Sequence, residues 1–140
     1  MKDGKIRIGI IGAGNIAQNA HIPSYLKQKD SEIVAVCDLK EDRAREVAQK
    51  YQIRHVAKDI NELVSLDEVD AVSICTWNNA HMQAAVEAAR AGKHILCEKP
   101  MAMTVKEAQT MEEAAGKNNV ILMLGFVNRF REDIRQCQKG

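Results

Sequence analysis

The chain has 140 residues, 46% of them hydrophobic, and its 20 Lys and Arg residues nearly balance its 19 Asp and Glu residues. This is the size of one domain whose core needs no disulfide or metal for support. The balanced charge argues against a nucleic-acid partner, and no apolar run approaches the roughly 18 residues of a membrane span, which argues against a membrane partner.

The first predicted strand runs directly into a glycine-rich turn. Residues 5–17 read KIRIGIIGAGNIA, in which four isoleucines precede Gly12-Ala13-Gly14 and Ala17 completes the spacing G-x-G-x-x-A. In a dinucleotide-binding turn, the first glycine permits the backbone to turn, the second lets the chain approach a pyrophosphate, and the small third residue lets the next helix pack closely. The same pattern also occurs in turns that serve packing alone, so the context has to decide.

Asp38 is the residue that favours the dinucleotide interpretation. It ends the next apolar run, 24 positions after Gly14 (38 − 14), near the roughly 20-residue spacing of an acid that binds the adenosine ribose. Such a carboxylate accepts hydrogen bonds from both ribose hydroxyls and repels a 2′-phosphate, which favours NAD over NADP. The alternative is a helix N-cap, which is compatible with ribose binding. Lys40 and Arg43 lie close enough in the sequence to bind a 2′-phosphate, so NADP stays open.

The rest of the chain alternates strands with helices. A helix is expected after Gly14, with a break or kink near Pro23, because proline cannot donate to the carbonyl of Asn19. Further strands are predicted at residues 32–38, 55–57, 70–75, 94–98 and 120–124. This alternation predicts an α/β fold with a doubly wound parallel sheet and right-handed crossovers.

Helical spacing of apolar residues predicts the buried faces of three helices. These faces are Ala44, Val47, Ala48 and Tyr51; Met82, Ala85, Val86 and Ala89; and Val105, Ala108, Met111 and Ala115. Gly92 is suited to the left-handed cap that ends the second of these helices. Thr104 and Glu107 have the spacing of a capping box at the start of the third.

Polar residues follow several predicted strands, at the edge where ligands collect in a doubly wound sheet. Residues 76–81 (TWNNAH) follow the fourth strand, Glu98 and Lys99 the fifth, and residues 128–129 the sixth. By residue type and place alone, His81 is expected to be a surface or capping residue, with contact to the cofactor or the substrate as the alternative. Lys99 can donate to a substrate hydroxyl or carbonyl, or can form a solvated pair with Glu98, and the residue types leave both interpretations open.

The four cysteines, at positions 37, 75, 97 and 137, show no C-x-x-C pairing, and three of them lie inside predicted strands. Reduced core cysteines are therefore predicted, rather than disulfides or metal ligands, and no metal site is expected. Because no signal-peptide pattern follows Met1, a soluble cytoplasmic protein is predicted.

Several motifs together closely resemble a known family. GIIGAGNIA, HIP, CD, TWNNAHMQAAVEAARAGKHILCEKPMA and GFVNRF occur in the order typical of the N-terminal Rossmann domain of the Gfo/Idh/MocA oxidoreductases, over residues 5–131. The resemblance implies that the pyrophosphate is bound by Gly12, Gly14, Asn15 and Ile16, and the adenosine ribose by Asp38. It implies that the middle of the cofactor is bound by Thr76, Asn78 and His81, and the nicotinamide ribose by Glu98 and Lys99. It also implies that Lys99, aimed by a cis bond to Pro100, is the catalytic residue that hydrogen-bonds the reacting hydroxyl.

The sequence departs from the family pattern in two respects. Trp77 stands where the family commonly has proline, so that loop is expected to take a different path. Family members also continue into a second domain that supplies most substrate contacts and the oligomer interface. Residues 1–125 are therefore predicted to be the dinucleotide-binding domain, and residues 126–140 the start of the connection to a second domain that this sequence lacks.

The predicted function follows from that resemblance. It is the binding of NAD, with NADP left open, within an oxidoreductase that transfers hydride between nicotinamide and a sugar, polyol or related secondary alcohol. Little turnover is expected from this chain unless a second domain is supplied, and a homo-oligomer is an expected assembly. The alternative is a dinucleotide-sensing regulatory or interaction module without catalysis.

Overall fold

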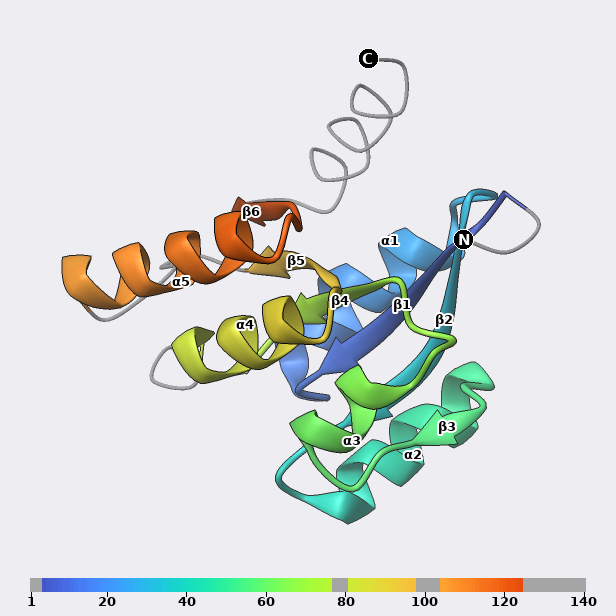
Figure 1. The fold of residues 1–140 in the computed structure, drawn as a ribbon. Coiled ribbons are helices and arrows are strands. Elements are labelled where there is room, and N and C mark those ends of the chain that lie inside the picture. Colours follow the sequence, from blue (N-terminus) through green and yellow to red (C-terminus); the bar gives the residue numbers. More distant parts are fainter. Residues whose placement is uncertain (1–3, 77–80, 98–103, 125–140) are drawn as a thin grey trace.

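The computed structural model describes residues 4–76, 81–97 and 104–124, which form a six-stranded sheet covered by helices (Figure 1). The strands are β1 (Ile6–Ile11), β2 (Ser31–Cys37), β3 (His55–Val56), β4 (Ala71–Ile74), β5 (His94–Cys97) and β6 (Leu122–Leu124). They lie in the order β3-β2-β1-β4-β5-β6, and all neighbouring pairs are parallel. This is the strand order of doubly wound dinucleotide-binding folds, so the predicted fold class is confirmed.

Helices cover both faces of this sheet. They are the π-helix η1 (Ala17–His21), α1 (Ile22–Leu26), α2 (Glu41–Tyr51), α3 (Ile60–Ser65), α4 (His81–Arg90) and α5 (Val105–Lys117). η1, α1 and α2 pack on one apolar layer, and α3, α4 and α5 pack on the other. Figure 1 shows α1 behind the central strands and α4 in front of them. Within the described ranges, no helix combines the length and the apolar character that crossing a bilayer requires.

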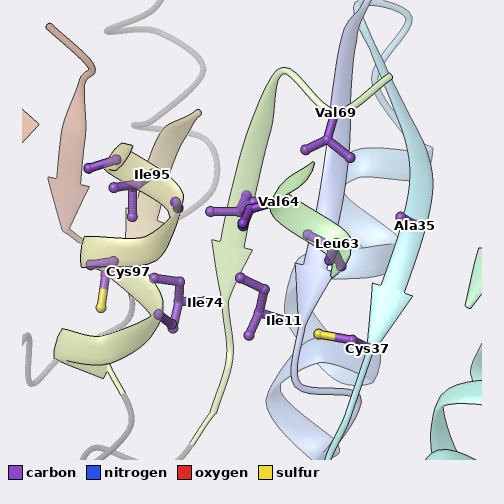
Figure 2. Packing of buried hydrophobic residues seen from close by; sticks show 14 of the residues in the cluster. Ile11, Ala35, Cys37, Leu63, Val64, Val69, Ile74, Ile95 and Cys97 are labelled. Carbon is purple, nitrogen blue, oxygen red and sulfur yellow. The ribbon is translucent and has the colours of Figure 1, made fainter. Parts of the chain in front are cut away.

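A row of four core residues lies at the carboxyl ends of the central strands. Cys37, Ile11, Ile74 and Cys97 are successive register partners across β2, β1, β4 and β5. Each is 3% exposed or less, and Figure 2 shows them in one apolar cluster. Because close packing fixes this row, it also fixes the positions of Gly12, Asp38 and Cys75, which follow β1, β2 and β4.

The helix after the glycine turn changes type before Pro23, where the sequence predicted a break or kink. η1 has π geometry, and the N–H of Ile22 donates to the carbonyl of Ala17. α1 then begins, with Pro23 in its first turn, where a missing N–H is tolerated. The extra residue of the π turn places both His21 and Ile22 in the core, each with 0% exposure.

The predicted buried face is largely correct for α2 and partly wrong for α4. In α2, Ala44, Val47 and Ala48 are buried as expected, and Tyr51 is half-buried against the core. In α4, the buried alanines are Ala84, Ala85, Ala88 and Ala89, whereas the expected Met82 and Val86 are only half-buried. An alanine-rich helix is apolar over much of its circumference, so the spacing fits two overlapping faces equally well.

The start of α5 also differs from the prediction. Thr104 is its N-cap, as predicted, and the side chain accepts a hydrogen bond of 3.1 Å from the N–H of Glu107. Val105 is 77% exposed, however, and the buried face is carried by Met111 and Ala115. The first turn of α5 therefore serves the cap and leaves the packing to later turns.

Three of the predicted core cysteines lie within the described residues, and all three are buried and outside any disulfide, as expected: Cys37, Cys75 and Cys97. Burial and the neighbouring charge of Asp38 raise the pKa of the Cys37 thiol to about 12. Since the thiolate is the reactive form, the fold protects this side chain both sterically and electrostatically.

These thiols provide a measurable test of the core. In a Cys137→Ser variant, we expect Cys37, Cys75 and Cys97 to react with a thiol reagent only as fast as the protein opens. For Cys37, a pKa rise from 9.0 to about 12 alone lowers the thiolate fraction about 1,000-fold. Ellman titration with and without urea measures the difference, and reaction of the native protein at the rate of an exposed thiol would contradict this packing.

Candidate functional site

The glycine turn follows β1, which lies beside β4 in the sheet. The chain continues from β1 into one half of the sheet and from β4 into the other half, so the turn lies at the switch point of a doubly wound fold. Gly12 has φ 96°. A Cβ atom placed on it would lie 2.9 Å from both the carbonyl carbon and the oxygen of Cys75. Since both the dihedral angle and the contact exclude a side chain, only glycine lets the chain leave β1 along this path.

Asp38 connects the turn to the neighbouring strand and helix. Its Oδ2 accepts a hydrogen bond of 2.6 Å from the N–H of Ala13, and its Oδ1 accepts one of 2.8 Å from the N–H of Lys40. The guanidinium of Arg43 donates through Nε at 3.1 Å and through Nη2 at 2.9 Å to Oδ2, and through Nη2 at 3.0 Å to Oδ1. The Asp38 side chain is only 2% exposed, so these contacts replace water around a buried carboxylate.

The surroundings of Asp38 favour its charged form. Burial alone would raise the pKa of this carboxyl, but the backbone donors of Ala13 and Lys40 and the ion pair with Arg43 outweigh burial and lower it. The carboxylate therefore stays ionised well into the acid range. Its charge is partly neutralised by the guanidinium that shares its oxygens.

Gly14 differs from Gly12 because the fold itself has room for a side chain there. An added Cβ would meet only the guanidinium of Arg43, 3.8 Å from Nη1, and the φ of Gly14 is not in the left-handed region. Helical backbone begins at Asn15 and Ile16, which are both exposed. The empty space at Gly14 and the N–H groups at the start of this helix are the features that a pyrophosphate uses.

The turn is also held from its far side. The Gln18 side chain donates to the carbonyl of Ala13 at 2.9 Å, and the Gln18 N–H donates to the carbonyl of Gly14 at 3.1 Å. Because the N–H of Ala13 also donates to Asp38, both the N–H and the carbonyl of Ala13 are hydrogen-bonded. The turn is preorganised before any ligand binds.

Three buried polar side chains that sequence reasoning missed fasten η1 and α1 to the sheet. His21 Nδ1 and the hydroxyl of Tyr25 each lie 2.8 Å from Oγ of Ser73, in the middle of β4. His21 and Ser73 are 0% exposed and Tyr25 is 4% exposed. In the sequence, a serine inside an apolar strand was the only sign of these contacts, because residue spacing does not show which helix residues contact that serine.

His81 was expected at the surface or in a cap, and the surface placement is wrong, because the side chain is 1% exposed. It is the first residue of α4, and its Nε2 lies 3.0 Å from the carbonyl oxygen of Thr76. A carbonyl only accepts, so Nε2 carries the proton and donates. His81 therefore ties the start of α4 to the residue that follows β4.

The predicted site residues within the described ranges gather along one edge of the sheet. The turn follows β1, Asp38 follows β2, and Thr76 with His81 follows β4. Asn78, Glu98 and Lys99 lie outside the described residues, as do the bond to Pro100 and the predicted connection at 126–140. The turn, the helix start and the strand-end acid fit a dinucleotide, so fold and site define a dinucleotide-binding Rossmann domain.

Comparison with known proteins places the chain in a family. Residues 6–126 match the family described as "Oxidoreductase family, NAD-binding Rossmann fold", and the chain belongs to this Gfo/Idh/MocA family. It is 36% identical over 139 residues to D-glucoside 3-dehydrogenase of Escherichia coli K12, covering 99% of this chain and 40% of that protein. It is 34% identical over 135 residues to myo-inositol 2-dehydrogenase of Thermotoga maritima, covering 96% of this chain and 40% of that protein.

A solved structure shows the same architecture. A variant of a 3-ketoreductase from Actinomadura kijaniata, in complex with TDP-benzene and NADP, superimposes with a TM-score of 0.82 at 27% identity. The match covers 97% of this chain and 43% of that one. The chain thus spans about 40% of the length of the relatives that it matches.

The role of Gly12 predicts a large loss of stability in Gly12→Ala. A side chain at φ 96° would be strained and would contact the Cys75 backbone, and we expect a loss of about 2–4 kcal/mol in the free energy of unfolding. Gly116→Ala is the matched control, because nothing lies within 4 Å of a Cβ on Gly116 in α5. It should gain up to about 1 kcal/mol. Urea unfolding measures both, and equal effects would refute the steric account of Gly12.

The state of Asp38 predicts an acid-dependent loss of stability. The pKa of Asp38 is lower in the folded protein than its ordinary 3.8. The ionised carboxylate therefore stabilises the folded state in full above pH 3.8, and this stabilisation is lost as the pH falls through the folded-state pKa. Asp38→Asn should lose about 1.5–3 kcal/mol at neutral pH. Asp42→Asn, at an exposed position of α2, is the control. Urea midpoints measured from about pH 6 downward should converge for wild type and Asp38→Asn, and curves that stay parallel would argue against this linkage.

Proposed function

We propose that the chain is the dinucleotide-binding unit of an oxidoreductase that transfers hydride between nicotinamide and a sugar, polyol or related secondary alcohol. The observation that carries the proposal is the turn at residues 12–14, bonded to Asp38 at the switch point of the sheet. The family match and the relatives named as D-glucoside and myo-inositol dehydrogenases support this substrate class.

In this proposal, each part of the edge holds one part of the cofactor. Gly12, Gly14, Asn15 and Ile16 hold the pyrophosphate, which approaches closely because Gly14 has no side chain. Asp38 binds the adenosine ribose. The residues after β4 hold the middle of the cofactor: Thr76 and Asn78 contact it, and His81, which is buried and bonded to the Thr76 carbonyl, acts by positioning that segment.

The residues proposed at the nicotinamide end of the cofactor rest on the resemblance to the family. Glu98 and Lys99 are proposed at the nicotinamide ribose, with Lys99 as the catalytic residue that donates to the substrate oxygen and manages its proton. A bound nicotinamide supplies the hydride chemistry, and the protein supplies orientation. The chain spans about 40% of the length of the relatives that it matches, and the family resemblance implies that most substrate contacts come from outside residues 1–125. We therefore propose cofactor binding with little turnover by this chain alone.

The alternative of a dinucleotide-sensing module without catalysis is not favoured, because the two relatives described above are named as dehydrogenases. We also propose a cytoplasmic location, supported by three buried cysteines that form no disulfide in the part of the chain that the structure describes. Assembly into a homo-oligomer stays a prediction.

The proposal predicts that Gly14→Ala separates binding from folding. The new methyl group meets no backbone atom, so the urea midpoint should stay close to that of wild type. The methyl group would occupy the place of the pyrophosphate, which should weaken NAD binding roughly 10-fold or more. Calorimetric titration of NAD against wild type, Gly14→Ala and the control Gly116→Ala measures this. If wild type binds neither NAD nor NADP, the proposed function is refuted.

A further inference from the structure

One continuous helix leads from the proposed pyrophosphate site into the core. Helical backbone runs without a break from Asn15 to Leu26 and includes η1 and α1. Asn15 and Ile16, at its start, are exposed and belong to the proposed site, whereas His21 and Tyr25 are buried against the sheet. The contacts that fix the buried end of this helix therefore also determine where the N–H groups at its start point.

Two polar contacts hold the buried end, and both converge on one hydroxyl. Oγ of Ser73 lies 2.8 Å from His21 Nδ1 and 2.8 Å from the hydroxyl of Tyr25. Ser73 lies in the middle of the sheet, where its register partners are Ile10 in β1 and Leu96 in β5. His21 and Tyr25 are four positions apart, so they lie on the same face of the helix. The three side chains form an anchor that joins two successive turns of the helix to one point of the sheet.

The anchor contributes direction as well as burial. Ala17 and Ile22 of the same helix are fully buried, but apolar packing is non-directional and leaves a helix some freedom to rotate and slide. A hydrogen bond requires a particular distance and angle. Apolar groups of the same shape can replace a buried hydrogen-bonded pair at little cost in stability. The polar character of the anchor therefore bears on the position of the helix more than on the stability of the fold.

The π turn makes the helix start depend on this anchor. In η1, the bond from the Ile22 N–H to the Ala17 carbonyl spans one residue more than an α-helical bond. Conversion of this turn to α geometry would rotate the helix start by roughly 100° relative to α1. On the other side of η1, the Gln18 N–H and side chain bond to the glycine turn. The anchor therefore keeps α1 in the one setting at which the helix start meets the turn.

We propose that Ser73, through His21 and Tyr25, is a positioning residue for pyrophosphate binding, because it fixes the helix whose first N–H groups receive the pyrophosphate. This inference rests on the proposed function, since it assumes that a dinucleotide binds at the glycine turn. Ser73 is 0% exposed and lies in the core, so it acts on the ligand only through the helix. Its loss should therefore affect the pyrophosphate and spare the adenosine.

The experiment compares Ser73→Ala with Val72→Ala. Val72 is the matched control, because it is the preceding residue of β4, is also 0% exposed and packs in the opposite apolar layer. Two ligands are titrated: the dinucleotide that wild type binds more tightly, NAD or NADP, by calorimetry, and adenosine, which has no pyrophosphate, by NMR. Circular dichroism and urea midpoints establish that each variant is folded.

We expect Ser73→Ala to weaken dinucleotide binding roughly 10-fold and to change the dissociation constant of adenosine less than about twofold. Val72→Ala should lower the urea midpoint, because it leaves a cavity, but should change neither constant more than about twofold. Tyr25→Phe removes one of the two contacts and keeps the ring in the core. It should weaken dinucleotide binding roughly threefold, and it decides the question alone if Ser73→Ala does not fold.

Three outcomes would overturn the proposal. The folded Ser73→Ala and Tyr25→Phe variants could bind the dinucleotide as wild type does, which would mean that the anchor serves stability alone. They could weaken the dinucleotide and adenosine equally, or Val72→Ala could weaken the dinucleotide as much as they do, and either result would mean a general loosening of the site. Failure of wild type to bind NAD or NADP would instead refute the proposed function, and it would be seen before any variant is tested.

Discussion

The carboxylate of Asp38 is the interaction on which the site depends. It stands where β2 ends, and it bonds to the turn after β1 through Ala13, to the start of α2 through Lys40, and to the first turns of α2 through Arg43. A buried charge without such partners would destabilise the fold, so the Asp38 carboxylate and its three partners hold one another in position. The shape of the turn is thus part of the folded state and does not wait for a ligand.

At the opposite ends of the strands, a second acid has a purely architectural task. Asp70 accepts from the backbone N–H of Arg7 at 2.8 Å and from its guanidinium Nε at 3.1 Å, and so ties β1 to the start of β4. Burial opposes ionisation of Asp70, but the bonds from Arg7 lower its pKa nonetheless. Both acids are paired with arginine, and what distinguishes them is the place: only Asp38 lies at the carboxyl edge, beside a turn with empty space.

The sequence was sufficient for the fold where the signal is local, because the alternation of strands and helices predicts the parallel sheet. Gly12, Gly14 and Asp38 also lie after β1 and β2, where the spacing along the chain places them. The sequence did not predict contacts that depend on how separate elements pack. The bonds of His21 and Tyr25 to Ser73 join residues about 50 positions apart, and the buried face of α4 could not be chosen because alanines lie on several sides. The ion pair of Arg43 with Asp38 was missed for a third reason: the sequence placed both residues near the ribose but did not show that they bind each other.

The two glycines of the turn answer the question that the spacing left open. A turn that serves packing alone needs glycine at position 12, where φ and the backbone of Cys75 exclude a side chain. Packing does not need glycine at position 14, where an added Cβ would be in ordinary contact with one flexible side chain and nothing else. The packing of the fold therefore does not require the second glycine, and the space beside it is open to a group that approaches the backbone from outside. In the proposed function, that group is the pyrophosphate of the cofactor, at the start of the following helix.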